Sequence, residues 1–474
     1  MNTETLDKVR LEVNSRLDQK NKSKLGQFMT AAVVADYMAS LFDKNTKNAK
    51  IIDCGAGIGS LSIAAIKVLK KVELVDQWEI DPIMQEQLEK NMQMVGVNFS
   101  INRQDFIFGA VENIRSGTGE RYTHAIINPP YKKISSSSEY RQELRKVGIE
   151  TVNLYTAFFA LSILLMKKAG QIVIIIPRSF CNGPYYKPFR EMMLKECCIE
   201  HIHVFESRNK VFKDDEVIQE NIILKVTKGK KQGDVEISQS TDHEFKDYQT
   251  KAVAFADVVK PNDAEVFIHI PTGEKGNESN PLFAASLSEL GISVSTGPVV
   301  SHRMTEFLEK NPTDGAVPLL YPHHFVDRQF QYPKEHKKPN AIKVTPDSQK
   351  WLMANSGFYV IVRRFSAKEE KRRVVAYIIN PEEIGKEWIG FDNCWNVFHV
   401  KKKGFDEVTA RGLACFLNST LLDDYFRVFS GHTQVNATDL KNMKYPKMAT
   451  LKRLGEKYQS TMSQKQIDEL LGSE

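Results

Sequence analysis

The chain has 474 residues, a net charge of +6, 42% hydrophobic residues and 26% charged residues. This length exceeds what one hydrophobic core normally organises, so we expect two domains. No apolar run reaches the roughly 18 residues of a membrane-spanning helix, and the polar N-terminus lacks the apolar segment of a secretory signal. The mild positive charge permits a polyanionic partner without requiring one. We therefore expect a protein with neither a membrane span nor a secretory signal.

The cysteines are scattered along the chain, and no two of them form a CxxC pair. This spacing favours neither a disulfide framework nor a zinc site, and it indicates a reducing, cytoplasmic environment. We expect no metal site. The cysteines are Cys54, Cys181, Cys197, Cys198, Cys394 and Cys415.

Strand-like and helix-like segments alternate through the first half of the chain. The pattern predicts strands at residues 50–55, 72–81, 99–106, 124–131 and 171–177, and helices at residues 60–71, 82–96 and 153–170. A β-α-β-α order is typical of a parallel sheet with helices on both faces, which is a Rossmann-like α/β fold.

The alternation weakens after about residue 229, where a polar segment is followed by short apolar pieces separated by polar loops. Such a pattern indicates a mixed α+β second domain. We place the boundary near residue 240, which gives domains at residues 1–240 and 241–474.

A glycine-rich turn follows the first predicted strand. Asp53, Gly55 and Gly57 belong to a run with G-x-G-x-G spacing, which differs from the dinucleotide-binding fingerprint. Glycines let the backbone approach a ligand, and the start of the next helix favours a carboxylate, while Asp53 suits an ammonium group. The second strand ends at Glu79 and Ile80, where a carboxylate can accept hydrogen bonds from ribose hydroxyls. These features suit S-adenosylmethionine, a nucleoside that carries an amino acid; a turn without a ligand is the alternative.

The third predicted strand ends in a further carboxylate and an aromatic ring. Asp105 is placed to accept a hydrogen bond from the adenine amino group of the cofactor, with Phe106 against the adenine ring. A solvated loop carboxylate beside a core phenylalanine is the alternative.

The fourth predicted strand ends in Asn128-Pro129-Pro130-Tyr131. Methylation of an exocyclic amine requires acceptors at its N–H groups, because the nitrogen lone pair is delocalised into the ring. The Asn128 side-chain oxygen and the Pro129 carbonyl can serve, since the prolines fix the backbone direction. Tyr131 offers a ring on which a base can stack, and Lys132 and Lys133 can reach phosphates. A turn that only ends the strand is the alternative.

Segments in this order resemble the motifs of amino-methylating DNA methyltransferases, in particular the gamma class of adenine-N6 enzymes. A second set is similar to the PstI/BsuBI group of type II modification methylases, and the resemblance spans about residues 24–445. The first set comprises residues 26–30, 53–62, 79–82, 128–131 and 211–224, and the second comprises residues 294–300, 362–376 and 430–440.

The resemblance implies a class I S-adenosylmethionine-dependent methyltransferase domain followed by a target-recognition domain. It also implies that Gln27, Phe28 and Thr30 line the methionine end of the cofactor pocket, and that Phe212 packs on the edge of a flipped base. Such enzymes often have proline where this chain has Ala31, so the local geometry there is expected to differ.

The second half of the chain carries two basic clusters, at residues 363–373 and 401–403, which can supply sequence-independent affinity for phosphate. For the first cluster, a solvated charged turn is the alternative. Residues 432–436 carry polar side chains that can contact base edges or the DNA backbone, and a capped loop at the domain junction is the alternative there. Residues 346–347 and 369–371 loosely match a metal-nuclease pattern. Its permissive spacing makes chance matches frequent, so we expect modification without cleavage.

We expect transfer of a methyl group from S-adenosylmethionine to adenine N6 in double-stranded DNA, with the base flipped out of the helix. A separate restriction endonuclease is the expected functional partner, and the protein is expected to act as a monomer or dimer. The alternatives are a cytosine-N4 enzyme, a methyltransferase for RNA or protein glutamine, and a DNA-binding regulator without catalysis.

Overall fold

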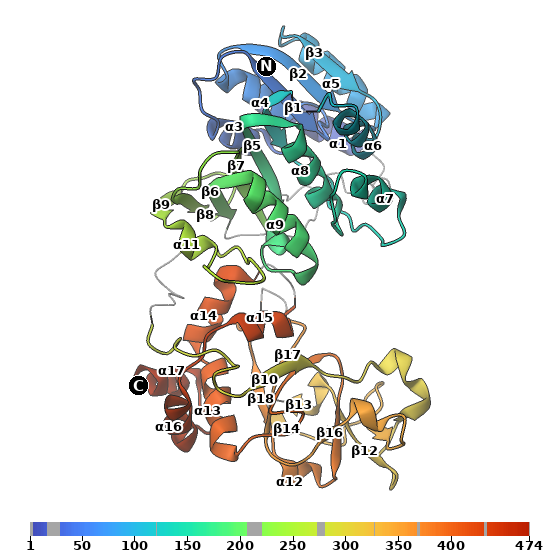
Figure 1. The fold of residues 1–474 in the computed structure, drawn as a ribbon, viewed down its shortest axis with the longest axis vertical. Coiled ribbons are helices and arrows are strands. Elements are labelled where there is room, and N and C mark those ends of the chain that lie inside the picture. Colours follow the sequence, from blue (N-terminus) through green and yellow to red (C-terminus); the bar gives the residue numbers. More distant parts are fainter. Residues whose placement is uncertain are drawn as a thin grey trace. The chain divides into compact units, whose positions relative to one another are not determined.

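The computed structural model in Figure 1 describes residues 3–16, 29–119, 121–205, 220–272, 280–326, 328–366, 370–430 and 434–473. The chain divides into two compact units, Met1–Thr272 and Gly273–Glu474. The division falls later than the predicted residue 240, because β8 (Val235–Ser240) and β9 (Gln249–Val253) extend the sheet of the first unit. No described helix combines the length and the apolar character of a membrane span.

The first unit contains a nine-stranded sheet in the order β3-β2-β1-β4-β5-β7-β6-β8-β9. The strands from β1 to β5 pair in parallel, whereas β7 is antiparallel to both of its neighbours. The strand order reverses between β1 and β4, which is the place where a ligand crevice opens in doubly wound sheets. The bounds are β1 (Ala49–Cys54), β2 (Val72–Trp78), β3 (Phe99–Asn102), β4 (Tyr122–Ile127), β5 (Met166–Pro177), β6 (Cys197–Phe205) and β7 (Asn221–Lys228).

Helices cover both faces of this sheet. Successive strand residues face opposite sides, as a pleated strand requires: Ile51 packs in the core beneath α3, α4 and α5, and Ile52 packs in the core beneath α6, α8 and α9. The helices of the first core are α1 (Thr3–Arg16), α3 (Ala32–Ser40), α4 (Ser60–Val68) and α5 (Pro82–Gln93). Those of the second are α6 (Phe106–Arg115), α7 (Glu139–Arg145), α8 (Leu154–Leu165) and α9 (Lys187–Glu196). The short α11 (Phe255–Val258) also packs on it.

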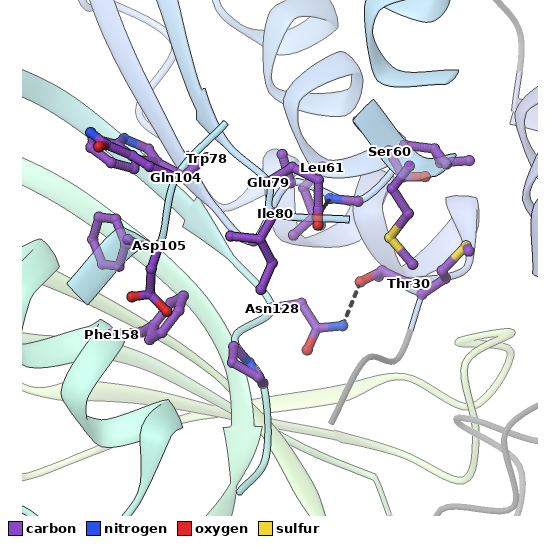
Figure 2. Close-up of a pocket in the computed structure, with 18 residues that line it drawn as sticks. Thr30, Ser60, Leu61, Trp78, Glu79, Ile80, Gln104, Asp105, Asn128 and Phe158 are labelled. Atoms are coloured by element: carbon purple, nitrogen blue, oxygen red, sulfur yellow. Dashed lines mark hydrogen bonds between the residues drawn. The ribbon is translucent and has the colours of Figure 1, made fainter. Parts of the chain in front are cut away.

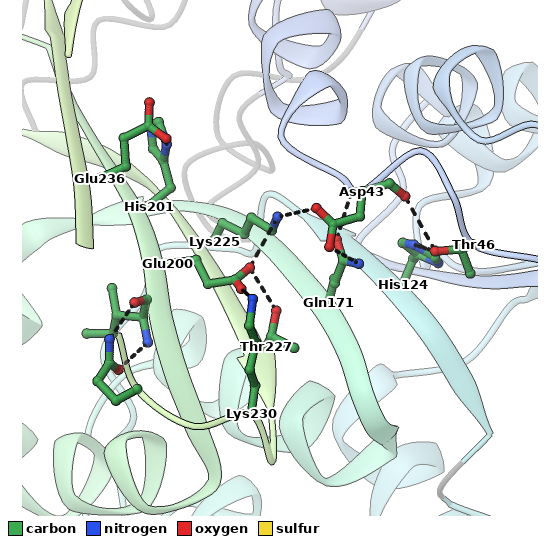
Figure 3. Close-up of polar contacts among 12 residues, drawn as sticks. Asp43, Thr46, His124, Gln171, Glu200, His201, Lys225, Thr227, Lys230 and Glu236 are labelled. Carbon is green, nitrogen blue, oxygen red and sulfur yellow. Dashed lines mark hydrogen bonds and ion pairs between the residues drawn. The ribbon is translucent and has the colours of Figure 1, made fainter. Parts of the chain in front are cut away.

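A polar network ties the sheet together near the amino end of β4 (Figure 3). The Lys225 ammonium group, on β7, lies 3.2 Å from Asp43 Oδ1 and 3.1 Å from Glu200 Oε2. The Gln171 amide donates to Asp43 Oδ2 at 3.1 Å, and Lys230 also pairs with Glu200. Because the Lys225 side chain is largely buried, its two carboxylate partners offset the cost of burying the charge. This network anchors the segment that leads into β1.

The second unit has a mixed architecture, as its weak sequence periodicity predicts. A four-stranded antiparallel sheet has the order β10-β20-β17-β18, and a five-stranded sheet has the order β11-β15-β12-β19-β16. The first comprises β10 (Ser293–Thr296), β20 (Trp395–His399), β17 (Tyr359–Arg363) and β18 (Ala376–Ile379). The second comprises β11 (Leu308–Glu309), β15 (Ala341–Lys343), β12 (Ala316–Leu320), β19 (Trp388–Phe391) and β16 (Met353–Ala354). β13 (Phe325–Val326) pairs with β14 (Gln329–Phe330).

Helices complete the second unit. They are α12 (Pro381–Ile384), α13 (Glu407–Leu417), α14 (Thr420–Phe429), α15 (Ala437–Asn442), α16 (Met448–Lys457) and α17 (Gln464–Gly472). The backbones of α13 and α16 approach closely at two glycines. A Cβ atom on Gly412 would lie 1.8 Å from the Leu451 carbonyl oxygen, and one on Gly455 would lie 1.9 Å from the Val408 carbonyl oxygen. Only glycine fits at these two crossing points.

We predict that Gly412→Ala destabilises the second unit. The added methyl group meets a backbone carbonyl, so α13 and α16 must separate, and overpacking of this kind typically costs about 1–3 kcal/mol. Thermal unfolding should therefore shift down by several degrees. Gly472→Ala is the control, because nothing lies within 4 Å of a Cβ atom there. Equal unfolding temperatures for the two variants would contradict the close helix packing.

Candidate cofactor and substrate site

A cavity opens at the carboxyl ends of β1, β2 and β4, beside the point where the strand order reverses (Figure 2). Most of its lining comes from residues at the carboxyl ends of these strands and of β3 or at the starts of the helices that follow, and Phe158 comes from α8. The predicted residues that line it are Thr30, Gly55, Gly57, Glu79, Ile80, Asp105, Phe106, Asn128 and Pro130. The structure thus brings together side chains that are separated by about 100 positions in the sequence.

The glycine turn forms the floor of this cavity. Gly55, Gly57 and Gly59 have φ values of 83°, 56° and 86°, a left-handed conformation that side chains other than glycine rarely adopt. The Gly55 amide donates to the Trp78 carbonyl at 2.9 Å, which holds the turn against the end of β2. A Cβ atom on Gly55 would lie 3.8 Å from the Asn128 carbonyl oxygen. The turn therefore brings the backbone after β1 next to the backbone after β4.

Glu79 presents a carboxylate to the cavity from the end of β2. Its Oε2 accepts from the Gly57 amide and its Oε1 from the Asp81 amide, both at 2.8 Å. The side chain is buried, and burial raises the pKa of Glu79 to about 7. The turn thus fixes the position of an acceptor that is close to its protonation midpoint at neutral pH.

Asp53 does not line the cavity, although the sequence grouped it with the glycines. It lies within β1 and is fully buried, and the Ser62 hydroxyl of α4 donates to its Oδ2 at 2.7 Å. The Gln77 amide in turn donates to the Ser62 oxygen at 2.9 Å. Burial raises the pKa of Asp53 to about 7. In this structure, Asp53 supports the strand and helix beneath the turn and does not reach the cavity surface.

The third wall is aromatic and carries a second carboxylate. Asp105 caps the amino end of α6: its Oδ1 accepts from the Ile107 amide at 2.8 Å, and its Oδ2 accepts from the Tyr140 hydroxyl at 2.7 Å. The Phe106 ring lies 4.9 Å from the Phe158 ring, centroid to centroid. A flat apolar group has room to bind against these rings because both line the cavity.

Asn128 holds its side-chain amide in one orientation. Its Nδ2 donates to Thr30 Oγ1 at 3.0 Å, the dashed line in Figure 2. Its Oδ1 accepts from the Tyr131 hydroxyl at 3.0 Å, and that hydroxyl also lies 3.2 Å from the Ile175 carbonyl oxygen. The amide is thus held by a hydroxyl at each end, and Thr30 is a positioning residue for Asn128.

Pro129 and Tyr131 lie beside the cavity and are not part of its wall. Pro129 is buried. The Tyr131 ring packs edge-on against Tyr155, with centroids 6.2 Å apart and planes at 86°. The stacking role predicted for Tyr131 stays a prediction. Gln27, Phe28 and Phe212 lie outside the described residues.

Sequence reasoning missed several residues of this site. Phe158 sits in the uniformly apolar helix α8, where nothing in the sequence marks one phenylalanine as different from the others. Trp78 and Gln104 also line the cavity. They directly precede Glu79 and Asp105 in the sequence, so including the residue before each predicted carboxylate in the cavity wall would have identified them.

The basic cluster at residues 363–373 is largely used inside the second unit. Arg373 is 1% exposed, its amide donates to Asp423 Oδ1 at 2.7 Å, and its guanidinium group lies over the Phe426 ring. Arg372 donates to the Ser419 carbonyl at 2.8 Å, and Arg363 pairs with Glu370. These contacts dock α14 on the sheet. The phosphate-binding role proposed for the whole cluster therefore does not extend to Arg373.

Only part of the polar loop at residues 432–436 is described. Asn436 begins α15, where its backbone amide and its Nδ2 donate to Asp439 Oδ2 at 2.9 and 3.1 Å. This is the contact of a helix start, so Asn436 has a structural use. The first two residues of the loop lie outside the described residues.

The chain resembles known restriction–modification proteins along nearly its whole length. Residues 44–212 match the family of the Eco57I restriction-modification methylase. The type II methyltransferase M.BsuBI of Bacillus subtilis is 49% identical over 95% of this chain and 93% of its own length. M.PstI of Providencia stuartii is 42% identical over 98% of this chain and 96% of its own length. The chain belongs to the type II DNA methyltransferases.

Two solved structures share the fold of this methyltransferase. The DrdV–DNA complex has a TM-score of 0.51 at 12% identity, with 92% of this chain and 57% of that chain covered. A nuclease-deletion mutant of LlaGI with a DNA substrate mimic also gives 0.51 at 12% identity, with 95% and 56% covered. The predicted α/β fold of class I S-adenosylmethionine-dependent methyltransferases, followed by a mixed domain, is confirmed.

We predict that the contribution of Asp53 to the stability of the unliganded methyltransferase falls as pH rises toward 7. Between the ordinary Asp pKa of 3.8 and about 7, folded Asp53 keeps a proton that the unfolded chain has released. This contribution therefore decreases with pH across the window, and Asp53→Asn should remove it, up to about 4 kcal/mol at pH 8. Glu79, whose pKa is raised in the same direction, contributes a second decrease. Unfolding temperatures are measured from pH 5 to 8 for the unaltered protein and for Asp53→Asn, and their slopes against pH are compared. The surface variant Asp36→Asn is the control. An unchanged slope in Asp53→Asn would contradict this account.

Proposed function

We propose that this methyltransferase transfers a methyl group from S-adenosylmethionine to N6 of an adenine flipped out of duplex DNA. The observation that carries the proposal is that Asn128 and the glycine turn line one cavity. A methyl donor and an amine acceptor must meet in one space, because the reaction is a displacement in which positioning dominates. At that point the chain offers an amide acceptor and a cavity lined by carboxylates and aromatic rings.

The residues present fit S-adenosylmethionine. The Glu79 carboxylate suits the ribose hydroxyls, the Phe106 and Phe158 rings suit a purine, and Asp105 suits its amino group. Gly55 and Gly57 leave the backbone open to the amino-acid part. The Asp53 carboxylate does not fit a direct contact with the ligand ammonium group, because it is fully buried and does not line the cavity. When bound, the cofactor supplies a methyl group attached to a sulfonium sulfur, and that sulfur becomes a neutral thioether when the methyl group is transferred.

Asn128 and Pro129 activate the acceptor amine in this proposal. The Asn128 Oδ1 and the Pro129 carbonyl accept from the two N–H groups of the target, which returns lone-pair density to the nitrogen. Thr30 accepts from Asn128 Nδ2 at 3.0 Å, which leaves the amide oxygen available as an acceptor for the target. Fixed dipoles of this kind need no rearrangement during reaction. As the N–C bond forms and the S–C bond breaks, the amine releases one proton to solvent.

Adenine N6 is favoured over other amines by resemblance and by the order of the motifs. The near full-length similarity to type II methyltransferases supports DNA as the substrate and weakens RNA or protein glutamine. Cytosine N4 requires the same chemistry and is the second candidate. The asparagine held in the cavity argues against a regulator without catalysis. A separate restriction endonuclease is the proposed functional partner, since the relatives named are type II methyltransferases.

We predict that labelled methyl groups transferred to DNA are recovered as N6-methyl-2′-deoxyadenosine. The purified protein is incubated with duplex DNA and labelled cofactor, and the DNA is digested to nucleosides and separated. Structured RNA and a glutamine-containing protein serve as parallel substrates and should stay unlabelled. Label on N4-methylcytosine would select the second candidate, and label in protein alone would refute the proposal.

Asn128→Ala should lower turnover by about 100-fold or more while DNA binding is kept. The variant removes an acceptor that acts on the reacting amine, and loss of one such preorganised group typically costs 100- to 1,000-fold, about 3–4 kcal/mol. Single-turnover methylation and DNA affinity are measured side by side. Asn98→Ala, an exposed position at the amino end of β3, is the matched control. Turnover equal to that of the control would exclude the assigned role.

A further inference from the structure

A tight turn in the second unit carries three consecutive lysines. The turn follows β20, and Val400 and Lys403 exchange backbone hydrogen bonds of 2.8 and 2.9 Å around its tip. The two residues between them, Lys401 and Lys402, have φ values of 49° and 63°. Residues 401–403, here called the lysine turn, are all exposed.

The backbone of the lysine turn is held from both sides. The Lys402 amide donates to His399 Nδ1 at 3.2 Å, and the Tyr359 hydroxyl lies 3.0 Å from the Lys402 carbonyl oxygen. Just after the turn, a Cβ atom on Gly404 would lie 2.3 Å from the Gly357 carbonyl carbon, so the two backbones touch. The lysines therefore extend from a rigid support, and little backbone freedom is lost when they bind a partner.

Lysine is a poor choice for this backbone conformation. Hairpin turns with two left-handed residues favour Asn-Gly, because in this conformation a Cβ atom lies too close to the following carbonyl oxygen, and only Gly, or Asn with its local hydrogen bonds, avoids the strain. Strain of this kind is retained where another requirement outweighs it. Within the described part of the chain, no carboxylate pairs with any of the three lysines, so their charges are not used to stabilise the fold.

The other basic cluster gives an instructive contrast. Arg363 pairs with Glu370, and Arg373 is buried beneath α14. The positive charges there serve packing within the second unit, whereas the lysine turn leaves three ammonium groups in solvent. Uncompensated positive charge on a rigid exposed tip is complementary to the regular negative charge of a nucleic-acid backbone.

We propose that the lysine turn binds the phosphate backbone of duplex DNA and contributes affinity that does not depend on base sequence. This inference rests on the proposed function, in which duplex DNA is the substrate. The lysine turn then has the role of positioning DNA on the second unit, since phosphate contacts set the register in which other side chains read bases. The backbone strain at Lys401 and Lys402 is the cost of placing two adjacent ammonium groups at the tip.

One double variant of the lysine turn should raise the stability of the protein and lower its affinity for DNA. In the double variant Lys401→Asn, Lys402→Gly, the turn receives its preferred residues, so the unfolding temperature should rise by about 2–4 °C. DNA affinity should fall by about tenfold at moderate salt, and the slope of log affinity against log salt should decrease by about 0.9 for each phosphate that the variant no longer neutralises. Cofactor binding should not change.

The control variant Lys70→Asn, Lys71→Asn removes the same charge from two exposed lysines that precede the amino end of β2, opposite the cavity. It should keep the DNA affinity and the salt slope of the unaltered protein. Unchanged affinity in the turn variant, or equal losses in both variants, would overturn the inference. If the unaltered protein itself binds no duplex DNA, the proposed function fails, and the inference fails with it.

Discussion

The site depends on the parallel pairing of β1 with β4. Ile51 lies opposite His124 and Ile52 opposite Ala125, so the two strands run side by side and end at the same edge of the sheet. This register brings the turn after β1 and the asparagine after β4 to the two sides of one cavity. Neither segment forms a site alone. A slip of one residue would turn the side chains of β4 to the opposite face and separate the two segments.

The same arrangement requires ionisable groups to lie in a buried setting. Asp53 and Glu79 are both buried, and the pKa of each is raised to about 7 because water is excluded. Their roles nevertheless differ. Glu79 faces the cavity and is held by the amides of the turn, whereas Asp53 is enclosed under α4 and bonded to Ser62. A buried carboxylate near a ligand site is therefore not by itself a ligand contact, and its hydrogen-bond partners decide which role it has.

Much of this could be predicted from sequence wherever a residue type is demanded by backbone geometry. The glycines after β1, the helix start at Asp81 with Pro82 in the first turn, and the prolines after β4 follow from φ preferences and capping. Boundaries were less accurate. The helix predicted to end at residue 170 ends at Leu165, where the chain becomes extended. The helix α6 was missed because Phe106 was interpreted as the end of a strand, whereas it begins the helix that Asp105 caps. Which face of β1 the Asp53 side chain occupies depends on packing that no local pattern records.

Charge was the least informative signal in the second unit, because a run of cations has the same appearance in sequence whether it is buried or free. Arg373 and Lys402 both belong to basic clusters, yet one is enclosed by α14 and the other is exposed. What distinguishes them is the environment that the fold provides: the Arg373 guanidinium group is buried over the Phe426 ring, whereas Lys402 is exposed and no described carboxylate pairs with it. A cation that the fold does not neutralise keeps its full attraction for an external anion. The backbone conformation is a second observation that does not depend on charge. Turn geometry alone would favour Asn or Gly at Lys401 and Lys402, so the presence of lysine there is explained by its side chain.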